Sequence, residues 1–137
     1  MQTAFRYPAV FLAALGLAAC VAEKPEPVPT GAEDFAQYCS ACHGAGGKGD
    51  GELAADLTTK PADLTGLTAR NGGTYPSTAV MAQIWGYTGG KGGTRVMPEF
   101  AGLLDGELVP YDGGDGIMTP TPIRLVQLAE YVKGLQE

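Results

Sequence analysis

The sequence predicts a small all-α domain in which a few helices are joined by long loops. Three observations support this fold class. Residues 30–38 begin with a helix-capping pattern, residues 80–85 carry an apolar stripe at helical spacing, and residues 125–135 repeat apolar side chains every three or four positions. The stretch 108–120 is the exception, because its pattern favours a hairpin or turn, so a small β-hairpin there is an option.

The N-terminal segment is predicted to be an export signal at residues 1–19. It has a cationic start at Arg6 and an apolar run from Ala9 to Ala22, which is too short for a comfortable membrane span. Leu17-Ala18-Ala19-Cys20 resembles the lipobox of bacterial lipoproteins, which implies cleavage before Cys20 and acylation of that residue. Ordinary cleavage after Ala22 is the alternative. Residues 20–29 are rich in proline and predict an extended tether between lipid and domain.

The composition limits the classes of partner. The 137 residues fit one domain, predicted at residues 30–137, which we expect to be monomeric. Cleavage before Cys20 would remove Arg6 and no acid, leaving eight basic and fifteen acidic residues and a formal charge of −7. Without a basic stripe the chain is not expected to bind nucleic acid.

The stretch Cys39-x-x-Cys42-His43 carries the clearest chemical signal. It matches the attachment motif of a c-type haem, in which two thiols add to the two vinyl groups and the histidine binds the iron. If the predicted helix continues through the motif, side chains three and four residues apart lie on one side of it, as this chemistry needs.

Other interpretations of this stretch are weaker. Gly44, Gly46 and Gly49 spell a dinucleotide-binding pattern, but no apolar strand precedes them, and no Ser or Thr follows Lys48 as a phosphate-binding loop requires. Structural zinc prefers four nitrogen or sulfur ligands, and with Cys20 acylated only Cys39, Cys42 and His43 remain besides carboxylates. A thioredoxin-like motif would need surrounding strands, which the sequence does not show.

The run "CSACHGAGGKGDGELAADLTTKPADLTGL" resembles the haem segment of bacterial class I cytochromes c. The resemblance extends over residues 30–137 and implies a few helices around one haem c, attached through Cys39 and Cys42. It also implies that His43 is one axial ligand and that the carbonyl of Pro61 accepts the other N–H of that ring. Such proteins are electron carriers rather than enzymes.

The other axial ligand is expected to be a methionine. Met97 lies in "GTRVMPEF", which resembles the ligand loop of the family, and is the preferred candidate. Met118, in the stretch that favours a hairpin, is the alternative, whereas Met81 belongs to the apolar stripe and is assigned to the core. The glycines between Gly89 and Gly93 raise the entropic cost of ordering the loop before Met97, so a labile ligand is a further option.

The last helix supports the same fold. Thr121 is expected to cap it, and Pro122 to occupy its first turn. In the family the first and last helices cross closely through a small residue and an aromatic on one, and Leu and Tyr on the other. Gly31, Phe35, Leu128 and Tyr131 match these four positions.

The sequence therefore predicts a mono-haem electron carrier, lipid-anchored on the periplasmic face of a membrane. Its partners are expected to be redox proteins, with basic docking faces suited to its acidic surface, although Lys91 and Arg95 flank the predicted ligand loop. Two alternatives stay open: a haem c subunit of a periplasmic dehydrogenase or oxidase complex, and a haem ligand sensor with an open sixth position.

Overall fold

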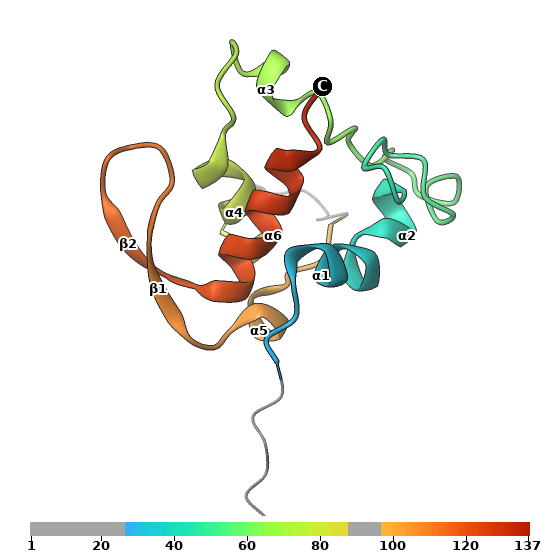
Figure 1. Cartoon of the computed structure of the whole chain (residues 1–137). Helices are drawn as coiled ribbons and strands as arrows, with labels where there is room; N and C mark the ends of the chain where they lie inside the picture. The colour runs from blue at the N-terminus through green and yellow to red at the C-terminus, as the bar shows by residue number, and fades with distance from the viewer. Residues whose placement is uncertain (1–26, 88–96) are drawn as a thin grey trace, which may run out of the picture.

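The computed structural model describes residues 27–87 and 97–137. Helix α6 (Ile123–Gly134) lies near the middle of the molecule, with α1 and α4 beside it and the shorter elements and loops around them (Figure 1). In chain order the elements are α1 (Gly31–Tyr38), α2 (Ser40–His43), α3 (Leu67–Arg70), α4 (Ser77–Trp85), α5 (Ala101–Leu104), β1 (Leu108–Asp112), β2 (Met118–Pro122) and α6 (Ile123–Gly134).

Helix α1 begins at the predicted capping box. The hydroxyl of Thr30 accepts the backbone N–H of Glu33, and the Glu33 carboxylate accepts the backbone N–H of Thr30 at 2.7 Å. These bonds satisfy donors that the first turn of a helix leaves free. The start of α1, and hence the position of the cysteines after it, is therefore fixed by local chemistry.

The predicted crossing of α1 and α6 is confirmed. Gly31 lies so close to α6 that an added Cβ would be 2.0 Å from the carbonyl oxygen of Gln127. Phe35 and Leu128 are both buried, and the rings of Phe35 and Tyr131 lie 5.1 Å apart between centroids in a tilted arrangement. Such aromatic contacts stabilise a packed interface.

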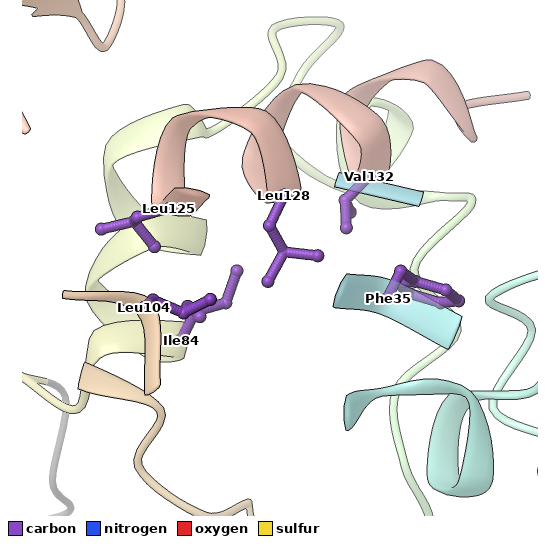
Figure 2. Packing of buried hydrophobic residues seen from close by; sticks show 6 residues of the cluster. All are labelled: Phe35, Ile84, Leu104, Leu125, Leu128 and Val132. Atoms are coloured by element: carbon purple, nitrogen blue, oxygen red, sulfur yellow. The ribbon is translucent and has the colours of Figure 1, made fainter. Parts of the chain in front are cut away.

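The hydrophobic core is small and is formed by side chains of four helices, α1, α4, α5 and α6. Figure 2 shows its buried side chains pointing toward one another from α1, α4, α5 and α6. They are Phe35, Ile84, Leu104, Leu125, Leu128 and Val132. The core thus holds α4 and α6 against each other and places α1 beside them.

An ion pair between a buried carboxylate and a partly exposed arginine also joins α1 to α6. The Asp34 carboxylate is fully buried and accepts two bonds from the Arg124 guanidinium, one of them from Nε at 3.1 Å. Arg124 Nη1 donates to the Leu103 carbonyl at 2.6 Å, so the same side chain also reaches α5. This fork-shaped arrangement fixes the relative position of the three helices.

The fold is not purely helical. Strands β1 and β2 form a two-stranded antiparallel sheet, with Leu108 opposite Pro122 and Asp112 opposite Met118. The optional hairpin near residues 108–120 is thereby confirmed, and the domain is a set of helices with one small sheet. The hairpin lies on the outside of the helices (Figure 1).

The predicted cap of the last helix is wrong. Thr121 belongs to β2, where it pairs with Val109, and its hydroxyl donates to the Thr119 carbonyl at 2.9 Å. Pro122 takes the N-cap position instead, without a side-chain cap bond. Strand pairing outweighs the local capping preference because it holds both neighbours of Thr121 in extended conformation.

Within residues 27–87 and 97–137, no helix is long and apolar enough to cross a membrane. The predicted export signal, the predicted lipidation site Cys20 and most of the predicted tether lie outside the described residues, as do Lys91 and Arg95.

Candidate cofactor site

A cavity of about 510 Å³ lies between α1, α2, α4, α6 and the loop around residues 57–64. Its wall is mainly apolar, and buried core side chains such as Phe35, Ile84 and Leu128 form part of it. Cofactor and small-molecule sites commonly have about 300–1,000 Å³ and a mainly apolar wall with a few placed polar groups. The cavity therefore has the size and character of such a site.

The motif at residues 39–43 lies at the junction of α1 and α2, and all three of its chemical groups line this cavity. Cys39 is the residue between α1 and α2, and its carbonyl accepts the backbone N–H of His43 at 2.9 Å, which holds the motif in a single helical turn. Cys39, Cys42 and His43 are all in the cavity wall, and both thiols are free. Two thiols and one imidazole are thus available to the same occupant.

The ring of His43 is oriented by the loop across the cavity. Nδ1 lies 2.9 Å from the carbonyl oxygen of Ala62. A carbonyl only accepts, so Nδ1 carries the proton in this bond and Nε2 keeps a lone pair for a metal. Such an outer bond also raises the basicity of a ligating histidine.

The prediction that the Pro61 carbonyl accepts this N–H is wrong by one residue, because the acceptor is the carbonyl of Ala62. The carbonyl of Pro61 faces Gly49 instead, where an added Cβ would be 2.5 Å from that oxygen. Gly49 also has a φ of 77°, a conformation that favours glycine. The Ala62 carbonyl oxygen lies 3.3 Å from the same added Cβ, so the loop passes Gly49 closely at both residues, and Pro61 remains in the cavity wall.

The environment of Cys39 argues against thiol exchange. Burial raises the pKa of the Cys39 thiol to about 12, and the nearby Asp34 carboxylate and Cys42 add to the rise. Reactive C-x-x-C thiols have lowered pKa values, because the thiolate is the nucleophile. Among the described residues no group of three or more His, Cys, Asp or Glu is arranged to hold a metal ion, so a zinc site has no support in that part of the chain.

Of the three methionines in the described parts of the chain, Met97 alone is in the cavity wall. Met81 packs against the core from α4, and its terminal methyl lies near Gly113 of the hairpin. Met118 is on β2 with 65% of its surface exposed, outside the cavity wall. The structure thus gives no support to Met118 as the alternative ligand, because the hairpin extends away from the cavity.

The segment around Met97 is held to α4 by two bonds. The backbone N–H of Phe100 donates to the Ile84 carbonyl at 3.1 Å, and the Gln83 amide nitrogen lies 3.8 Å from the Met97 sulfur. The preceding glycine-rich loop, residues 89–93, lies outside the described residues. Sequence reasoning missed Gln83, although it shares a helix face with Val80 and Ile84, and this spacing would have placed it toward the same side.

Two thiols, an imidazole nitrogen and a thioether sulfur therefore surround one mainly apolar cavity. These groups fit a haem, because the two thiols can form thioether bonds to it, and the imidazole nitrogen and the soft thioether sulfur can bind its iron.

Comparison with known families points the same way. A family model described as "Cytochrome C oxidase, cbb3-type, subunit III" matches residues 26–109. No curated protein and no solved structure matches the chain significantly.

Proposed function

Because the chain belongs to this family of c-type cytochrome domains and is a mono-haem class I c-type cytochrome, we propose that it carries single electrons through one haem c bonded to Cys39 and Cys42 and ligated by His43 and Met97. The observation that supports this assignment best is the cavity, because all four side chains line it. A bound haem supplies an iron that changes between the ferrous and ferric states by one electron.

The ligand pair decides what such a site can do. A thioether is a soft, neutral donor, and it favours ferrous iron relative to a second histidine. If His43 and Met97 both held the iron, they would leave no coordination site there for a substrate. Electrons then enter and leave with little rearrangement of the protein, which suits a carrier rather than an enzyme.

Absorption spectra test this ligation. We expect the ferric protein to be low-spin, with the weak charge-transfer band of a sulfur–iron bond. Met97→Ala should abolish the band, and Met118→Ala should leave it in place. A high-spin ferric spectrum of the wild-type protein would instead support the ligand-sensor alternative.

The proposed location is the periplasmic face of a membrane, with Cys20 carrying the lipid. This proposal is supported by the lipobox-like Leu17–Cys20 sequence and by the export that is typical of c-type cytochromes. Mass spectrometry of the N-terminal peptide from the membrane-extracted protein should find residues 1–19 removed and acyl chains on Cys20. A mature chain that begins at Glu23 instead would contradict the lipid anchor.

A second candidate function is that of a haem subunit within a larger oxidase, as the family description names a subunit III. The acidic surface of the chain suits partners with basic docking faces in either case. Purification in mild detergent separates the two functions: a subunit purifies with large partner chains in fixed proportion, and a free carrier purifies alone.

A further inference from the structure

The hairpin of β1 and β2 has an exposed apolar face. Residues that pair across an antiparallel ladder lie on the same face of it, as do alternate residues of one strand. The pairing therefore groups four apolar side chains, which we call the hairpin face: Leu108, Pro110, Met118 and Pro120. All four are exposed, with 57% of the surface of Leu108 and 65% of that of Met118 open to solvent. Exposed apolar patches with a polar rim mark interaction sites.

The opposite face of the hairpin is attached to the helices. The Tyr111 hydroxyl donates to the Glu130 carboxylate of α6 and lies 3.3 Å from the Ser77 hydroxyl of α4. At the turn, the Thr78 hydroxyl of α4 donates to the carbonyl of Gly113 at 3.5 Å. A surface that is already held in place loses less conformational entropy when a partner binds. The hairpin face is therefore presented in a fixed position.

Acidic residues flank the hairpin face along the chain. Four of them are exposed, Asp105, Glu107, Asp112 and Asp115, and residues 105–122 contain no lysine or arginine. A second copy of the chain would bring the same charges together, and an anionic lipid surface would repel them. Lysine and arginine side chains of another protein would attract them. The charges thus favour one occupant, a protein surface with an apolar centre and a basic rim.

The hairpin face lies away from the cavity. None of residues 108–122, all of which the structure describes, is in the cavity wall, and the hairpin lies on the outside of the helices (Figure 1). A protein bound there leaves the candidate haem site as it is. The family match ends at residue 109, so most of the hairpin lies beyond the part of the chain that the family model describes.

We propose that the hairpin face is the docking surface for a partner protein that presents an apolar patch bordered by lysine and arginine side chains. This inference rests on the proposed class of partner, redox proteins with basic docking faces. It gives that class a contact surface on the hairpin, where a partner holds the domain without covering the cavity.

Photo-crosslinking of the full, haem-loaded chain in its own membrane identifies the occupant. One sample carries the photoreactive residue benzoylphenylalanine in place of Met118. The control carries it in place of Leu53, which is 46% exposed and lies outside the hairpin. We expect the label at residue 118 to join a peptide of another protein in which apolar residues neighbour lysine or arginine, and the label at residue 53 to give little of that product. Any other main product, such as a lipid adduct, a dimer of this chain or a peptide without basic side chains, would overturn the proposal, as would equal yields from the two labels.

The sequence also offers a matched pair of variants, because Gly-Glu-Leu occurs at residues 51–53 and again at residues 106–108. The Glu and the Leu are exposed in both copies. Glu107→Lys with Leu108→Ser changes the rim and the hairpin face, and Glu52→Lys with Leu53→Ser makes the same changes elsewhere. Gel filtration of mild-detergent extracts, followed at the haem absorbance, measures the ratio of partner-bound to free protein.

We expect the hairpin variant to weaken association by about five- to thirtyfold, as for the loss of a central contact residue, and the control variant to leave it unchanged. Equal association of the two variants would overturn the hairpin face. Both variants should keep the haem spectrum of the wild type, because neither pair of residues is in the cavity wall. A wild-type protein that elutes only as the free chain, with its haem spectrum intact, would refute this surface and leave the proposed electron-carrier function standing.

Discussion

Substituting Gly31 by alanine tests the helix crossing on which the cavity depends. An added Cβ would lie 2.0 Å from the Gln127 carbonyl oxygen and 2.5 Å from its carbonyl carbon. An ordinary carbon–oxygen contact is about 3.3 Å or longer, so α1 and α6 must separate by roughly an ångström. The added Cβ is fixed to the backbone of α1, and the atoms that it meets belong to the backbone of α6, so neither can rotate away.

The expected magnitude follows from two opposing effects. Overpacking a close-packed site costs about 1–3 kcal/mol, and a backbone contact belongs to the upper part of this range. Alanine recovers about 0.5–1 kcal/mol relative to glycine in a helix, and less at the first helical residue. We therefore expect Gly31→Ala to lower the free energy of unfolding by about 2 kcal/mol.

Gly102→Ala is the matched control. Gly102 is also a helical glycine, in α5, but no atom lies within 4 Å of an added Cβ. That change should be neutral or raise stability by about 0.5 kcal/mol. Guanidinium unfolding of the haem-loaded proteins, followed by far-UV circular dichroism, measures both. If the two variants were equally stable, the close approach of α1 and α6 would be refuted.

Two further substitutions test other contacts of the same crossing. Phe35→Ala should lower the free energy of unfolding by about 3–5 kcal/mol, because it truncates a large buried aromatic; a loss well below 1 kcal/mol in chemical denaturation would count against the packing. Asp34→Asn should cost about 1.5–3 kcal/mol, the range of hydrogen bonds to charged groups, because Arg124 is partly exposed and would lose the charge of its buried partner. Asp34→Leu combined with Arg124→Met should recover part of that loss, and a double variant as unstable as Asp34→Asn would show that the charge pair is not the cause.

Local features were predictable from the sequence. The capping box needs only Thr30 and Glu33, three residues apart, so α1 begins where the pattern indicates. The crossing residues could be placed by resemblance, because each has a fixed distance from the cysteine motif or a fixed place on the last helix.

Features that depend on distant partners were not predictable. Whether the carbonyl of Pro61 or that of Ala62 accepts the hydrogen bond from His43 depends on how the loop passes Gly49. The two carbonyls belong to neighbouring residues, so the sequence alone does not distinguish them. The Asp34–Arg124 pair joins residues ninety positions apart, and nothing in the local pattern of either residue indicates the other. Thr121 has a good capping side chain, but strand pairing decides its conformation.

The most direct test of the account is the intact mass and pyridine haemochrome spectrum of the protein, matured in a host that attaches haem c. We expect a covalent adduct of one haem per chain, the haemochrome of two thioether bonds, and no reaction of Cys39 or Cys42 with alkylating reagents. A colourless protein in which both thiols are alkylated under denaturing conditions would contradict the account.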